Sequence, residues 1–231
     1  MQARIYQGRE SPPVKADITV VIDVIRAFTV SHYAFMKGIR RIFLVESVKQ
    51  AFQVKKQHPE YLLAGEVDAL KIEGFDLDNS PYYIQQKDLE GKVLVQKTTN
   101  GVRATLNNLS SEHVFVTGFT NARKTAEFIR ERIFRCNGAT INIIASHPCG
   151  DDDLACAKYV KSILEDSASI SEEEVISRIQ QSHVAEKFFD KDKKDFKRED
   201  IYCCTQELNT DFVMKVNKTG RIPVIERVNA C

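Results

Sequence analysis

Short apolar runs rich in β-branched residues alternate along this 231-residue chain with segments of helical periodicity. The runs are mostly apolar throughout and are bounded by polar residues or glycine, as expected for strands covered on both faces. They span residues 18–23, 41–45, 61–64, 92–96, 113–117 and 140–145. Strands that alternate with helices are typical of crossover connections in a largely parallel sheet. The order of these segments therefore predicts an α/β fold with layered α/β/α architecture.

Helix start and stop signals occupy the segments between and after the predicted strands. Helices are predicted over residues 29–37, 48–57, 102–109, 122–134, 154–164 and 172–189. Gly38 ends the first of these helices, and Ser47 is placed to cap the second. The segment 190–200 mixes both charge signs densely, so we interpret it as a solvated loop.

The last part of the chain predicts a hairpin with strands at 212–216 and 222–225, connected across Thr219-Gly220. Pro223 cannot donate a hydrogen bond to a neighbouring strand, so we expect the hairpin at an edge of the sheet. No internal repeat or linker-like segment interrupts the sequence. We therefore expect one unit over residues 1–231, with a smaller C-terminal lobe at about 166–231 as the alternative.

Positive and negative charges balance, with 33 Lys and Arg against 32 Asp and Glu. A protein without a global basic field has no general attraction for nucleic acid or membrane surfaces, so a local cluster must hold any anionic ligand. No run of 18 apolar residues and no signal-like N-terminus is present, which predicts a soluble, cytoplasmic protein. The six cysteines form no CxxC pair, which argues against both a disulfide framework and a four-thiolate zinc site.

Carboxylates follow the predicted strands at their carboxyl ends, where open α/β sheets bind ligands. Asp23 ends the first apolar run, Glu66 follows the third, and Asp76 lies later in the same connection. Mg²⁺ prefers such hard oxygen ligands, so these three residues form a candidate metal site. The alternative is that Asp23 pairs with Arg26 and that Glu66 faces water, and the sequence leaves both interpretations open.

The tetrapeptide Thr98-Thr99-Asn100-Gly101 opens a predicted helix, and Arg103 lies one turn further along. Unpaired backbone N–H groups, hydroxyls and the positive end of the helix dipole favour an anion at such a position. The segment therefore predicts a phosphate-binding loop, to which Arg26, Lys71 and Lys97 would add positive charge. The alternative is an Asn100 cap followed by a surface arginine.

Three acids at residues 151–153 begin another predicted helix, where negative charge is favourable for the helix dipole. A catalytic interpretation would use Asp152 or Asp153 to orient a water molecule or to join a metal shell. His147, beside Pro148, is predicted as a loop residue. The chain contains neither GxxxxGK[ST] nor GxGxxG after its first strand, which argues against a P-loop and a dinucleotide site.

Five spaced motifs extend these observations over most of the chain. They lie at residues 21–29, 65–81, 98–104, 118–122 and 152–157 and read VIDVIRAFT, GEVDALKIEGFDLDNSP, TTNGVRA, GFTNA and DDLACA. Their types and order resemble the 2-phosphosulfolactate phosphatase family, whose members are Mg²⁺-dependent enzymes of coenzyme M and sulfolactate biosynthesis.

The resemblance implies an unusual α/β fold and the hydrolysis of (R)-2-phospho-3-sulfolactate to 3-sulfolactate and phosphate, with Mg²⁺ in the site. Asp23, Glu66 and Asp76 become the expected metal and water-organising carboxylates, and Arg26 and Asp153 join Asp23 and Glu66 as expected catalytic residues. The expected contacts to a small anionic phosphoester are Asn79, Ser80, Thr98, Thr99, Asn100, Gly101 and Arg103. A homodimer is the expected assembly.

Three positions depart from the family pattern, one of which is Val30, where a small hydroxyl residue is common. Asp152 stands where Glu is expected, and Lys158 stands where Gly is usual. These departures put the identity of the substrate in question more than the activity itself. The alternatives are therefore a phosphatase for another phosphorylated hydroxy acid, or a protein that binds a small polyanion without turning it over. For the attacking group, water is expected and an Asp23 phosphoenzyme is the alternative.

Overall fold

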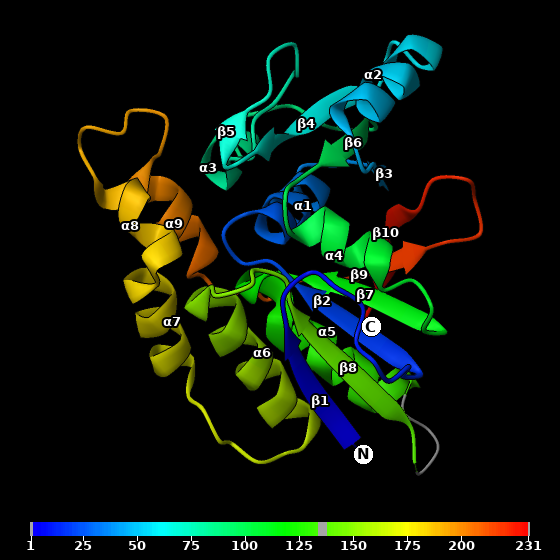
Figure 1. Ribbon diagram of the computed structural model, residues 1–231, viewed down its shortest axis with the longest axis vertical. Coiled ribbons are helices and arrows are strands. Elements are labelled where there is room, and N and C mark those ends of the chain that lie inside the picture. Colours follow the sequence, from blue (N-terminus) through cyan, green and yellow to red (C-terminus); the bar gives the residue numbers. More distant parts are fainter. Residues whose placement is uncertain (1, 134–137, 231) are drawn as a thin grey trace.

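A computed structural model describes residues 2–133 and 138–230 of the chain (Figure 1). The described strands form one mixed sheet in the order β1-β8-β2-β7-β9-β10-β3-β6-β4-β5. The strands are β1 (Gln2–Gln7), β2 (Ile18–Ile22), β3 (Arg41–Leu44), β4 (Leu62–Val67), β5 (Leu70–Lys71), β6 (Val93–Lys97), β7 (His113–Thr117), β8 (Thr140–Ala145), β9 (Phe212–Asn217) and β10 (Val224–Asn229). The predicted α/β class is confirmed, and each of the six predicted parallel strands is present.

Strand β2 shows why the apolar runs form strands at these positions. All five of its residues are buried, and it pairs in parallel with β7 on one side and with β8 on the other. Val21 packs into one hydrophobic cluster, whereas Val20 and Ile22 pack into another. Alternate side chains of a strand point to opposite faces, so an unbroken apolar run matches a strand with a core on both sides.

The sheet consists of two parallel halves that run in opposite directions. One half holds β1, β8, β2 and β7, and the other holds β3, β6 and β4. The antiparallel hairpin β9–β10 connects them by pairing β9 with β7 and β10 with β3. Figure 1 shows the helices α1 (Ala27–Met36) and α4 (Gly101–Asn107) between the two halves. Their buried side chains share one cluster with strands of both halves, so this layer is the centre of the core.

The remaining helices cover the outer faces and one end of the sheet. Helices α5 (Ala122–Phe128), α6 (Asp151–Leu164) and α7 (Glu172–Gln181) pack over the half that contains β2, and α2 (Val48–Gln57) packs over β4 and β6. The short helices α3 (Pro81–Ile84), α8 (His183–Phe189) and α9 (Arg198–Cys204) lie near the strand ends. The turn η1 (Phe119–Asn121) precedes α5, and the π-helix η2 (Ile129–Ile133) follows it. The end of the predicted helix 122–134 lies outside the described residues.

Two expectations about the second half of the chain hold only in part, since residues 190–195 of the predicted solvated segment are exposed and lie outside any helix or strand. The predicted helix 172–189 is divided at Ser182, whose extended backbone ends α7 and whose hydroxyl accepts a hydrogen bond from the Val184 N–H to begin α8. The predicted solvated segment 190–200 ends in the first turn of α9, where Asp200 is buried. A buried ion pair accounts for this burial and is described below.

The hairpin is also placed differently from the expectation, because β9 and β10 lie in the middle of the sheet and not at an edge. Pro223 precedes β10, so its missing N–H interrupts no pairing within that strand. Its carbonyl oxygen accepts a hydrogen bond from the Leu44 N–H at 2.9 Å. The hairpin is therefore part of the main sheet, while the division of the chain into units stays a prediction.

None of the helices in the described parts of the chain combines the length and the apolar composition that a bilayer crossing requires.

Candidate active site

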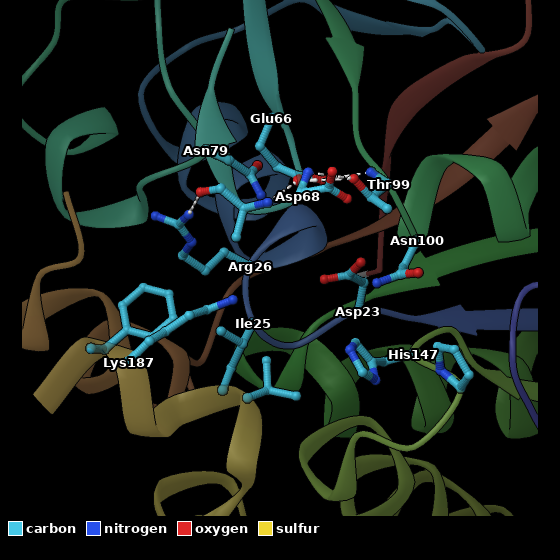
Figure 2. A pocket seen from close by; sticks show the side chains of 14 residues that line it. Asp23, Ile25, Arg26, Glu66, Asp68, Asn79, Thr99, Asn100, His147 and Lys187 are labelled. Atoms are coloured by element: carbon cyan, nitrogen blue, oxygen red, sulfur yellow. Dashed lines mark hydrogen bonds between the residues drawn. The ribbon is translucent and has the colours of Figure 1, made fainter. Parts of the chain in front are cut away.

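A cavity of about 320 Å³ lies where the carboxyl ends of β2, β4, β6 and β8 approach one another (Figure 2). Each of these strands is followed by residues that line the cavity, and α8 supplies the remaining wall. The lining residues are Asp23, Ile25, Arg26, Glu66, Asp68, Ala69, Asn79, Thr99, Asn100, His147, Pro148, Val184, Lys187 and Phe188. Asp23, Glu66, Thr99 and Asn100, which follow predicted strands, meet in this cavity, and the strands that supply them belong to both halves of the sheet.

Asp23 follows β2 and is held at the start of α1. Its Oδ1 accepts a hydrogen bond from the Ala27 N–H at 2.9 Å, and its Oδ2 accepts one from the Ser146 hydroxyl at 3.2 Å. Burial, with a smaller contribution from the nearby carboxylates of Glu66 and Asp152, raises the pKa of Asp23 to about 7. Gly101 lies so close that a Cβ atom there would be 2.6 Å from Asp23 Oδ2. The site therefore requires glycine at the start of α4.

Glu66, near the end of β4, is surrounded by hydrogen-bond donors from its own loop and from the loop after β6. Its carboxylate accepts hydrogen bonds from the backbone N–H groups of Ala69 and Thr99 and from the Thr99 hydroxyl. Thr98 is buried, and its hydroxyl accepts a hydrogen bond from the Val102 N–H. In the predicted phosphate-binding loop, Thr98 and Thr99 therefore use their hydroxyls in hydrogen bonds within the protein. Besides Thr99, Asn100 is the side chain of this loop that lines the cavity.

Arg26 is paired, but not with Asp23. Its guanidinium Nη1 lies 2.8 Å from Asp200 Oδ2, and its Nη2 donates to the Ala69 carbonyl oxygen at 3.0 Å. Ser80 donates its hydroxyl hydrogen bond to Asp200 Oδ1. The alternative of an Asp23–Arg26 salt bridge is therefore wrong, and Ser80 lies behind Arg26 instead of in the cavity wall.

Asp152 and Asp153 are both buried at the start of α6. Asp153 accepts hydrogen bonds from the Val24 N–H at 2.7 Å, the His147 N–H at 2.9 Å and the Ser146 hydroxyl at 3.0 Å. Burial raises the pKa of Asp153 well above its ordinary value, and the neighbouring Asp152 and Asp23 carboxylates add to this effect. Burial also raises the pKa of Asp152 to about 6. These acids therefore fix the loops around Asp23, beyond any interaction with the helix dipole.

Asp76 and Arg103, like Ser80, do not line the cavity, which corrects their expected roles. Asp76 accepts hydrogen bonds from the Leu63 N–H at 2.8 Å and from Lys55 Nζ at 3.2 Å, beneath α2. Arg103 is exposed on α4 and does not line the cavity. The Asp76 carboxylate joins its loop to β4 through the Leu63 N–H. The position of Arg103 on α4 places its side chain at the surface.

The structure adds groups that the sequence did not single out. Lys187 and Phe188 of α8 line the cavity, and the Phe188 ring centroid lies 4.9 Å from the Arg26 guanidinium carbon. Figure 2 shows Arg26 and Lys187 on the opposite side of the cavity from Asn100 and His147. Burial lowers the pKa of Lys187, with the charge of Arg26 as the next cause. No sequence motif marks Lys187, because it follows an ordinary amphipathic pattern.

The oxygen atoms of Asp23, Glu66 and Asn79 fit a hard divalent cation. Asp23 and Glu66 both line the cavity, and the Glu66 carboxylate adds to the rise in the pKa of Asp23, so two acidic groups lie close together there. Asn79 is 4% exposed and lines the same cavity, and its Oδ1 atom has no hydrogen-bond partner among the described residues. Buried oxygen atoms that lack donors are the ligands Mg²⁺ prefers.

A polar cavity lined by carboxylates and cations at the strand ends of an α/β sheet suits a small anionic ligand. Similarity to known proteins gives the class, which is that of the phosphoric monoester hydrolases. The sequence profile described as 2-phosphosulpholactate phosphatase matches residues 6–219. The chain belongs to the 2-phosphosulfolactate phosphatase family.

Individual relatives agree with this assignment. A probable 2-phosphosulfolactate phosphatase of Bacillus subtilis (strain 168) is 51% identical over 228 residues, which cover 99% of both chains. A second protein of the same description, from Clostridium perfringens (strain SM101 / Type A), is 32% identical over 94% of this chain and 92% of its own length. A third, from Caldicellulosiruptor saccharolyticus, is 36% identical over 67% of this chain and 65% of its own length.

Proposed function

We propose that this protein is a Mg²⁺-dependent phosphatase that hydrolyses (R)-2-phospho-3-sulfolactate to (R)-3-sulfolactate and phosphate. The observation that carries the proposal is the cavity itself, in which Asp23 and Glu66 lie together and Arg26 and Lys187 lie on another wall. The names of the relatives support the substrate, and the closeness of the Asp23 and Glu66 carboxylates supports the cation.

In this proposal, Asp23, Glu66 and Asn79 hold Mg²⁺, and Asp76 is no longer included because it lies beneath α2. The ion supplies Lewis-acid neutralisation of charge on the phosphoryl oxygens. Asp153 has a positioning role, because its carboxylate and that of Asp23 accept hydrogen bonds from the same Ser146 hydroxyl. That hydroxyl has one proton and can donate to only one of the two carboxylates at a time.

Arg26 and Lys187 bind the anionic groups of the substrate. A substrate with phosphate, sulfonate and carboxylate groups is strongly anionic and needs more than one cationic contact. Arg26 is fixed by Asp200, so its remaining N–H groups keep a defined direction, and a guanidinium can bind an oxyanion through two parallel hydrogen bonds. The Asn100 side chain, which makes no capping hydrogen bond to α4, is available as a neutral contact.

Water is the proposed attacking group, and a covalent phosphate on Asp23 is the alternative. In the first route the chain binds and orients both reactants and excludes bulk water. In the second route an Asp23 carboxylate oxygen displaces the alkoxide, and water then cleaves the acyl phosphate. Acid quenching of the enzyme with labelled substrate distinguishes them, because a labelled protein would reject direct attack by water.

The test of the function is phosphate release from synthetic 2-phosphosulfolactate, first after EDTA treatment and again after Mg²⁺ is restored. We expect release that depends on Mg²⁺, and its loss in Asp23→Asn with the fold intact by circular dichroism. Glu73→Gln is a matched control, because Glu73 is an exposed carboxylate outside the cavity. Wild-type activity in Asp23→Asn would remove Asp23 from the mechanism.

Two alternatives have distinct results in the same assay. Release from phospholactate or phosphoglycolate without release from 2-phosphosulfolactate would identify another phosphorylated hydroxy acid as the substrate. Saturable heat of binding in calorimetry without any phosphate release would identify a binding protein. A cytoplasmic location, a homodimer and the absence of a nucleic-acid partner stay predictions.

A further inference from the structure

Three side chains with soft or borderline metal-ligand atoms come together beside the cavity, separately from Asp23 and Glu66. His147 and Cys149 lie in the loop between β8 and α6, and His183 is the first residue of α8. One ligand atom from each of the three lies within 4.8 Å of the others. Because distant loops supply them, the absence of a CxxC or HExxH pattern in the sequence did not exclude this cluster.

The two sulfur–nitrogen distances within the cluster are close to those of a tetrahedral zinc site. Cys149 Sγ lies 3.8 Å from His147 Nδ1 and 3.7 Å from His183 Nε2. Zn–S and Zn–N bonds of about 2.3 and 2.05 Å at a tetrahedral angle place sulfur and nitrogen about 3.6 Å apart. The His147 Nδ1 atom accepts a long hydrogen bond of 3.3 Å from the Cys149 N–H, and the same lone pair would leave this weak contact to bind an ion.

Buried acids hold both loops in place without a metal ion. Asp153 accepts the His147 N–H at 2.9 Å, and Asp152 accepts the Ser182 hydroxyl at 3.0 Å, immediately before His183. Gly150 permits the turn, because a Cβ atom there would lie 2.9 Å from His147 Cβ. The two segments are therefore positioned by the protein, which lowers the entropic cost of binding a shared ion.

We propose that His147, Cys149 and His183 form a second metal site, which binds a borderline-soft divalent cation of the Zn²⁺ type. Thiolate and imidazole select such cations over Mg²⁺, which prefers oxygen ligands. Binding forms one metal–sulfur and two metal–nitrogen bonds, and the Cys149 thiol releases its proton to water. Cys149 and His183 are exposed and His147 also lines the cavity, so a fourth position is open to water or to an anionic oxygen of a bound ligand.

Cobalt binding tests this site independently of phosphatase activity. The full-length protein, treated with chelator and kept reduced, is titrated with Co²⁺ in the presence of excess Mg²⁺. We expect one Co²⁺ per chain with tetrahedral d–d bands in the visible range and a thiolate-to-cobalt charge-transfer band in the near ultraviolet. Zn²⁺ should remove both signals, because it binds such ligands more tightly than Co²⁺.

Variants assign the signals to the three residues. Cys149→Ser should abolish the charge-transfer band, and His183→Ala should weaken Co²⁺ binding about ten-fold or more. His58→Ala is the matched control, because His58 is an exposed histidine distant in the fold, beside Tyr61, and its variant should bind like the wild type. Circular dichroism confirms folding of each variant. Absence of a charge-transfer band in the wild type, or its survival in Cys149→Ser, would overturn the proposal.

Discussion

The buried ion pair between Arg26 and Asp200 allows a quantitative test of how the cavity is held in shape. The two side chains are 5% and 1% exposed, and their charged atoms lie 2.8 Å apart. Removing one partner from such a pair leaves an uncompensated buried charge, at a cost of about 3–5 kcal/mol of unfolding free energy. Asp200→Asn keeps an oxygen acceptor for the Ser80 hydroxyl and the Tyr82 N–H. We therefore expect its decrease in unfolding free energy to come mainly from the missing charge. Because the misplaced guanidinium lines the cavity, kcat/KM should fall about 100-fold.

The double variant Arg26→Met/Asp200→Asn, compared with Arg26→Met and Asp200→Asn alone, completes the thermodynamic cycle. Burial raises the pKa of Asp200 in spite of the opposing charge of Arg26, so desolvation offsets much of the attraction within the pair. The unfolding free energy of the double variant should therefore lie within about 1 kcal/mol of the wild-type value, while each single variant is far less stable. Urea unfolding followed by circular dichroism measures this, since the chain contains no Trp for fluorescence. A decrease in unfolding free energy of less than about 1 kcal/mol in Asp200→Asn would refute the reasoning.

Three further predictions follow from single contacts. Gly101→Ala should push Asp23 aside and lower kcat by about 10-fold or more, with a loss of about 1–3 kcal/mol in urea unfolding; an unchanged kcat would contradict the close approach. Burial lowers the pKa of His32 from 6.5 to about 3, so protonation favours the unfolded chain as pH falls below about 6.5, and the free energy of unfolding should fall by about 2 kcal/mol between pH 7.5 and pH 5 from this residue. His32→Gln should remove that part of the slope, and parallel curves for both proteins would refute it. Asp76→Asn should retain Mg²⁺-dependent phosphate release within about two-fold, whereas a large loss would return Asp76 to the metal ligands.

The parts of the fold that follow from local pattern were predictable from the sequence. The β2 run is apolar on both faces, and a carboxylate directly after it has to find donors or a cation, which is the situation of Asp23. Thr98 and Asn100 likewise belong to a helix start that their residue types indicate. Such inferences depend only on residues that are neighbours in sequence, so contacts between distant segments did not change them.

The features that the sequence missed depend on contacts between distant segments. Asp200 lies in a charge-rich stretch that is typical of a surface loop, and only the approach of Arg26 makes its burial favourable. Lys187 reaches the cavity because α7 ends at Ser182 and α8 continues in another direction. The hairpin was expected at an edge because Pro223 is unsuitable within a strand, and the pattern did not show that β10 begins one residue later.

The central position of the hairpin also bears on how the protein folds during synthesis. Strands β3 and β7 are made before the hairpin, yet β10, which pairs with β3, and β9, which pairs with β7, are among the last segments to leave the ribosome. Until then both strands present unpaired edges, which can pair with other chains. Every residue that lines the cavity precedes the hairpin in sequence, but the two halves that carry those residues cannot be joined through the sheet before it is made. Nascent chains that stall before residue 212 should therefore need chaperones to remain unaggregated.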